Sequence, residues 1–178
     1  MANREAIREL QTRLASRLQA ARDEGLSVSW LAVRSGGINF LFPLAQSGEI
    51  FPASAMQAVP YAMAWFRGVV NLRGGLYGVV DMAAFAAPDL PAAQAHKPPP
   101  VAESVVVTLN AALDVNCALL VDTLAGLRKA DSFASAQAPA ADGAPYLGNR
   151  FTDAEGETWQ EINLQTLSQL PRFLNITA

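Results

Sequence analysis

The fold is decided by the stretch Gly68-Val69-Val70-Asn71-Leu72-Arg73-Gly74, which is followed after Gly75 by Leu76-Tyr77-Gly78-Val79-Val80-Asp81. Two β-rich runs joined across Gly74-Gly75 predict a hairpin, because adjacent glycines supply the positive φ that a tight reversal needs. The hairpin places Arg73 at its tip. This arginine either braces backbone carbonyls or contacts a partner, since arginine is enriched among interface hot spots; the sequence leaves both interpretations open.

Short β-rich runs continue on both sides of this hairpin. Alternating apolar residues and turn signals predict about five strands before a Pro-rich stretch and about five after it, and this spacing is typical of small barrels or a sandwich. Before the hairpin, strands are expected around 28–32, 38–44 and 48–51, and 52–64 is expected to be a long excursion. After it, a helical turn is expected at 82–87, strands at 105–109, 115–121 and 124–129, a hairpin of 146–151 with 158–163, and a short helix at 164–170.

The remaining segments are expected to flank or connect this β domain. Residues 1–25 predict an amphipathic helix, because apolar residues recur at three- and four-residue steps (Ile7, Leu10, Leu14, Leu18, Ala21). We expect this helix to pack on the domain behind it rather than to be offered to a partner. Residues 26–178 are expected to form the domain, with Ala/Pro-rich loops near 88–103 and 132–145.

Composition excludes several classes of protein. The chain has 178 residues, enough for a single hydrophobic core without disulfide or metal, and a net charge of −3 with only two lysines. That balance provides no basic stripe for nucleic acid. No run of about 18 apolar residues and no secretory signal is visible. We therefore expect a cytoplasmic protein without membrane insertion, in which Cys117 is a small buried hydrophobe.

The sequence lacks the parts of an active site. It contains no G-x-S-x-G, Walker, C-x-x-C or H-E-x-x-H motif, and its one histidine, His96, lies in the Pro-rich stretch. Asp81 and Asp122 follow valine-rich strands, where an aspartate usually caps a turn or helix. We expect no enzyme, cofactor or metal. A barrel that binds a small molecule among its aromatic side chains stays open as an alternative.

Several ordered motifs together resemble the CheW-like adaptor family. They are Gly68 to Gly74, Val79-Val80-Asp81, Leu120-Val121-Asp122, Tyr146-Leu147-Gly148 and Ile162-Asn163-Leu164. The resemblance implies a mainly β fold of two five-stranded barrels around a shared hydrophobic core, with the N-terminal helix and a short C-terminal helix added. It also implies a non-catalytic adaptor that couples a methyl-accepting chemoreceptor to a CheA-type histidine kinase in arrays at the inner membrane, with other adaptor copies as further partners. The groove between the barrels is the expected receptor site.

The resemblance also assigns residues. By ungapped alignment upstream of the hairpin, Glu49 and Ile50 resemble receptor-contact positions, and Arg73 matches an arginine implicated in partner coupling. The remaining matches are expected to support strands (Asn71, Leu72, Val121, Asp122). Gly78 departs from the family, which usually has proline there. The run from Arg73 to Asp81, with Pro171 to Leu174, is most similar to PilI-type adaptors of type IV pilus and twitching systems; an adaptor for flagellar chemotaxis is the alternative.

Overall fold

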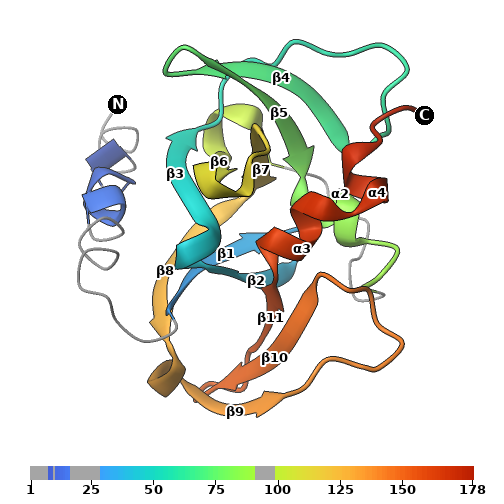
Figure 1. Ribbon diagram of the computed structural model, residues 1–178. Coiled ribbons are helices and arrows are strands. Elements are labelled where there is room, and N and C mark those ends of the chain that lie inside the picture. The colour runs from blue at the N-terminus through green and yellow to red at the C-terminus, as the bar shows by residue number, and fades with distance from the viewer. Residues whose placement is uncertain (1–7, 10, 17–28, 91–98) are drawn as a thin grey trace.

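The computed structural model describes residues 8–9, 11–16, 29–90 and 99–178 (Figure 1). The strands are β1 (Ser29–Ser35), β2 (Ile38–Pro43), β3 (Ser47–Pro52), β4 (Phe66–Leu72), β5 (Gly75–Asp81), β6 (Val105–Leu109), β7 (Cys117–Val121), β8 (Thr123–Lys129), β9 (Phe133–Gln137), β10 (Leu147–Asp153) and β11 (Thr158–Ile162). The helices are α2 (Met82–Ala86), α3 (Leu164–Gln169) and α4 (Pro171–Leu174), with 3-10 turns η1 (Leu44–Gln46), η2 (Val101–Glu103), η3 (Ala111–Leu113) and η4 (Ala130–Ser132).

The strands form two mixed sheets, which occupy the upper and lower halves of Figure 1. The six-stranded sheet has the order β8-β1-β2-β11-β10-β9, and the five-stranded sheet has the order β3-β6-β7-β5-β4. Neighbours are antiparallel except for β2 with β11 and β5 with β7, which are parallel. The mainly β prediction is therefore confirmed. The lower sheet combines the first two strands with the last four, so the two halves of the chain are interleaved.

The expected closed five-stranded barrels are not present. In the described part of the chain, β8 and β9 are the edge strands of the lower sheet and do not pair with each other. Likewise, the edge strands β3 and β4 of the upper sheet do not pair with each other. A single isolated bridge, Gln57 with Val69, links the segment after β3 to β4. The lower sheet also has six strands and not the expected five. Its additional strand is β9, which lies in the region predicted as the loop 132–145. Four of the five β9 residues are exposed, so no alternating apolar pattern marks this edge strand.

One hydrophobic core is shared by both sheets, as predicted. Strands of each sheet are buried on both faces: in β1, Leu31 and Val33 face the shared core, while Trp30 and Ala32 join a second cluster on the other side. In β7, Leu119 faces the shared core, and its neighbours along the strand join a third cluster. This two-sided burial explains the nearly continuous apolar runs, which would otherwise alternate with polar residues.

The N-terminal helix is described only in part. Residues 8–9 and 11–16 are helical, and Leu14 is buried within the shared core cluster, which confirms that this segment packs on its own domain. The rest of the predicted helix 1–25, including Ile7, Leu10, Leu18 and Ala21, lies outside the described residues, as do His96 and the greater part of the Pro-rich stretch. No helix among the described residues is long and apolar enough to cross a membrane.

A polar network fixes the C-terminal helices at the junction of the two sheets. The Tyr146 hydroxyl donates to Oδ2 of Asp89 over 2.8 Å, and the same carboxylate pairs with Arg172 of α4. The Arg172 guanidinium also lies 4.4 Å from the ring centroid of Phe85 in α2. Burial and the bond to Asp89 raise the pKa of Tyr146, so the phenol stays a neutral donor. Together these contacts tie α2, α4 and the start of β10 into one unit.

Removing the shared acceptor is expected to cost more than removing the donor. Asp89→Ala leaves the O–H of a fully buried tyrosine without its acceptor and Arg172 without its carboxylate partner, which together cost about 2 kcal/mol of unfolding free energy, whereas Tyr146→Phe deletes the hydroxyl itself and costs about 1 kcal/mol. Urea denaturation of both variants measures the difference. If Asp89→Ala costs no more than Tyr146→Phe, the loss of the shared acceptor does not determine the destabilisation.

Candidate protein-interaction surface

A β-bulge in β3 aims Glu49 outward. Between the pairs Ser47 with Leu109 and Ile50 with Val107, two β3 residues oppose the single residue Thr108. The backbone N–H of Glu49 donates to the Thr108 hydroxyl over 2.7 Å, which replaces a strand hydrogen bond. A Cβ on Gly48 would lie 2.1 Å from that hydroxyl oxygen, so only glycine allows β6 to approach this closely. The bulge is therefore built from glycine and threonine, and it re-aims the next side chain.

The hairpin is confirmed, but its turn lies one residue earlier than predicted. Gly75 already pairs with Leu72, so the two central residues are Arg73 and Gly74, with φ of 49° and 82°. Two positive φ values define the type I′ geometry that fits the twist of the flanking strands. The side chain of Asn71 accepts from the N–H of Gly74 over 2.9 Å. Arginine is unusual at a position with positive φ, where the backbone strain is of order 1 kcal/mol. This strain favours a functional role for the Arg73 side chain.

The structure brings Glu49 and Arg73 together. An Arg73 Nη atom lies 2.8 Å from a carboxylate oxygen of Glu49, and the guanidinium carbon lies 5.6 Å from the ring centroid of Phe51. Both charged side chains remain well exposed, at 73% for Arg73 and 54% for Glu49. Such an exposed pair contributes only about 0–1 kcal/mol to stability. Its two charges are thus held at a defined place on the surface and are accessible to a partner.

The structure places Ile50 differently from Glu49. Ile50 points to the opposite side of β3 and packs, half-buried, against the shared core. A charge at Ile50 would therefore disturb the scaffold. An exposed apolar side chain that sequence reasoning missed lies on the same hairpin as Arg73: Leu76 is 62% exposed. Because Leu76 lies in a strand-like run, the sequence suggested that it belongs to the hydrophobic core. It is exposed because it lies next to the protruding turn, where no other segment covers it.

The other motif residues support the scaffold, as expected. Asp81 caps α2, since its carboxylate accepts from the N–H of Ala84 over 3.0 Å. Asp122 accepts from the N–H of Gly36 over 3.0 Å and so holds the β1–β2 turn. Leu72 and Val121 are buried. Burial raises the pKa of the Cys117 thiol to about 12, which keeps it protonated, as a structural cysteine should be.

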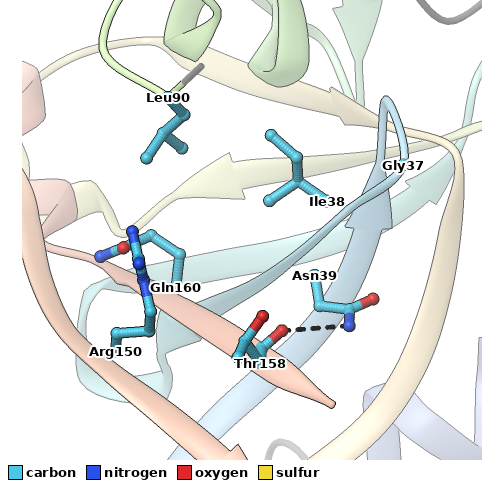
Figure 2. Close-up of a pocket in the computed structure, with 7 residues that line it drawn as sticks. All are labelled: Gly37, Ile38, Asn39, Leu90, Arg150, Thr158 and Gln160. Carbon is cyan, nitrogen blue, oxygen red and sulfur yellow. Dashed lines mark hydrogen bonds between the residues drawn. The ribbon is translucent and has the colours of Figure 1, made fainter. Parts of the chain in front are cut away.

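The pocket in Figure 2 does not favour the small-molecule alternative. It has a volume of about 190 Å³, below the roughly 300–1,000 Å³ of typical ligand sites. Its polar side chains already hold strands together: the Asn39 amide donates to the backbone oxygen of Thr158, and the Gln160 amide donates to two backbone oxygens. Arg150 is the charged side chain that lines this pocket. Among the residues with a described position, no group of three His, Cys, Asp or Glu side chains could hold a metal ion.

Comparisons with known proteins bear on the family and the fold. The family model of the CheW-like domain matches residues 29–171. Protein PilI of Pseudomonas aeruginosa is 28% identical over 168 residues, which cover 92% of this chain and 88% of PilI. The crystal structure of the scaffolding protein TtCheW from Thermoanaerobacter tengcongensis superimposes with a TM-score of 0.61 at 13% identity, over 82% of this chain and 95% of TtCheW. At that identity the superposition shows the fold.

The family match spans most of the chain and contains the hairpin, the bulge and both sheets. CheW-like domains are non-catalytic scaffolds of chemosensory signalling, which confirms the expectation that the chain is not an enzyme. The chain belongs to the family of CheW-like domains.

Proposed function

We propose that this protein is an adaptor that couples a methyl-accepting chemoreceptor to a CheA-type histidine kinase, in the chemosensory system that controls type IV pili and twitching motility. It acts in the cytoplasm, in receptor arrays at the inner membrane, where other adaptor copies are further partners. The observation that carries the proposal is the similarity to PilI over 92% of the chain, well beyond the limits of the family match.

The hairpin-tip surface, made of Glu49 and Arg73, suits an interaction of this kind. It presents two accessible opposite charges, and Leu76 of the same hairpin is an exposed apolar side chain. A partner can exchange the internal ion pair for a pair of its own, so docking leaves neither charge unmatched. Charges of this kind at the rim of an interface contribute mainly to specificity and association rate.

An adaptor of this kind works by binding two partners at once. An interface of roughly 1,200 to 2,000 Å² in total would be specific yet exchangeable, and many such contacts strengthen an array. A receptor signal passes only if the receptor and kinase states differ in free energy through these interfaces. The rigid shared core and the network around Asp89 suit a connector that keeps its fold.

A pulldown from native cytoplasm tests the proposal. The wild-type protein is expected to recover a histidine kinase, a methyl-accepting receptor and components of a pilus system, identified by mass spectrometry. Arg73→Glu is expected to recover them at one tenth or less, because the change reverses an exposed charge without removing a core contact. Circular dichroism confirms that both proteins are folded.

The identity of the recovered proteins separates the alternatives. Flagellar motor or chemotaxis components in place of pilus components would assign the adaptor to flagellar chemotaxis. Recovery of neither kinase nor receptor, under conditions that preserve arrays, would contradict the adaptor function.

A further inference from the structure

The side chain of Phe51 in β3 lies next to the hairpin tip. Its neighbour Ile50 packs against the shared core, whereas Phe51 packs, half-buried, against the third cluster, which contains Leu72 of the hairpin. The ring centroid of Phe51 lies 5.6 Å from the guanidinium carbon of Arg73. A cation within about 6 Å of a ring centroid is attracted by the π electrons of the ring. Arg73 therefore has a second contact in β3, besides the carboxylate of Glu49.

Side chains link the hairpin tip to β3. Among the described residues, β3 and β4 are opposite edges of the upper sheet and do not pair with each other, yet Arg73 reaches two side chains of β3. The backbone of Arg73 has a φ of 49°, and the side chain of Asn71 fixes the turn. Strained residues of this kind persist where the surrounding structure over-determines them, and they cluster at functional sites. The guanidinium is thus held in place although 73% of the side chain is exposed.

The two contacts of Arg73 respond differently to a partner. A partner that pairs with Glu49 takes its carboxylate away from the guanidinium. The contact with Phe51 does not depend on that carboxylate, so it persists during the exchange. An arginine side chain loses rotamer freedom when it is fixed, and a side chain that is already held loses less of this freedom on binding. The contact with Phe51 therefore favours the binding of a partner carboxylate by Arg73.

We infer that Phe51 is a positioning residue for partner binding, which holds the Arg73 guanidinium in place while Glu49 exchanges its ion pair. The inference rests on the proposed function, in which Glu49 and Arg73 bind a partner, here the histidine kinase. The charges define the surface of the kinase that fits. It presents a carboxylate to Arg73 and an ammonium or guanidinium group to Glu49. Phe51 is half-buried and uncharged, so it acts through Arg73.

Titration of the full chain with the kinase recovered in the pulldown tests this role. Phe51→Leu keeps an apolar side chain on the cluster but removes the ring, and it is expected to weaken kinase binding about threefold. Phe51→Tyr keeps the ring and is expected to bind like the wild type. Tyr77→Leu is the matched control, because Tyr77 is also half-buried and packs against the same cluster; it is expected to bind like the wild type. Phe51→Met replaces Phe51→Leu if melting shows that the leucine variant does not fold.

The same substitution in two further backgrounds separates positioning from packing. In a chain with Arg73→Gln, Phe51→Leu is expected to leave kinase binding unchanged, because there is no guanidinium to hold. In a chain with Glu49→Gln, it is expected to weaken binding more than threefold, because the ion pair with Glu49 no longer holds Arg73.

The outcomes distinguish the positioning role from the adaptor function. An equal effect of Phe51→Leu in all three backgrounds, or no effect in any, would overturn the positioning role and leave the adaptor function standing. Weak binding by Phe51→Tyr, or by Tyr77→Leu, would do the same, because packing and not the ring over Arg73 would then set the affinity. A kinase that does not bind the folded wild-type chain would overturn the adaptor function and the positioning role with it.

Discussion

Gly68→Ala is expected to lower the unfolding free energy by about 3 kcal/mol or more, the largest effect of any single change in the motif that defines the fold. Gly68 has a φ of +130°, which side-chain-bearing residues rarely adopt, and a Cβ there would lie 2.4 Å from the backbone oxygen of Gln57. Gln57 and Val69 exchange two backbone hydrogen bonds of 2.8 and 2.9 Å. The methyl group would push this segment off β4 and break the isolated bridge at the sheet's open side.

Gly74→Ala is the matched control for Gly68→Ala. Gly74 also has a positive φ, +82°, but a Cβ there meets nothing within 4 Å, so only the conformational strain of about 1 kcal/mol is expected. Urea denaturation of both variants separates strain from collision. Equal losses for the two would show that contact with Gln57 is not what requires glycine in the motif.

Arg73→Glu is expected to weaken kinase binding by tenfold or more while it changes the melting temperature little. The change places two carboxylates side by side at the hairpin tip and presents the wrong charge to the partner, but the native pair is exposed and contributes only about 0–1 kcal/mol to folding. Titration calorimetry with the purified kinase, together with thermal melting, measures both effects. Arg34→Glu is the control, because Arg34 forms an exposed pair with Glu157 in the other sheet; it is expected to bind the kinase normally.

The double variant Glu49→Arg, Arg73→Glu decides how the pair acts. It restores an internal ion pair with the charges exchanged. If the partner contacts these charges directly, kinase binding stays weak in the double variant, and this is the expected result. Recovery of wild-type binding would show instead that the pair acts within the adaptor, by holding the hairpin against β3.

The hairpin shows which structural features the local sequence predicts and which it does not. The two β-rich runs predict the strands of β4 and β5 correctly, but adjacent glycines made Gly74-Gly75 the expected turn. The turn is Arg73-Gly74, because the register that pairs Leu72 with Gly75 buries Leu72 and Val79 in one cluster. A shift by one residue would turn these side chains to the other face of the sheet. Gly78, which departs from the family proline, donates its N–H to Asn116 over 3.0 Å, a bond that proline cannot make.

The candidate site was predicted only in part. Alignment with the family selected Glu49, Ile50 and Arg73, but it could not show that the first and last form an ion pair while Ile50 faces the core. The cause is the bulge at Gly48, whose geometry depends on Thr108 in a strand 59 residues away in sequence. Leu76 was missed because apolar residues in strands are usually buried, and its exposure depends on how far the hairpin protrudes.

By itself, the sequence determined the mainly β architecture, the hairpin and the absence of known active-site motifs, because these follow from periodicity, turn residues and residue types along short segments. The shared core was implied by the resemblance to the CheW-like family. The tertiary structure alone decided that the two sheets stay open, that β9 joins the lower sheet, that Glu49 meets Arg73, and that Leu14 anchors the helix on the core. Each of these depends on contacts between segments far apart in sequence, whose relative positions are set by packing and not by local preference.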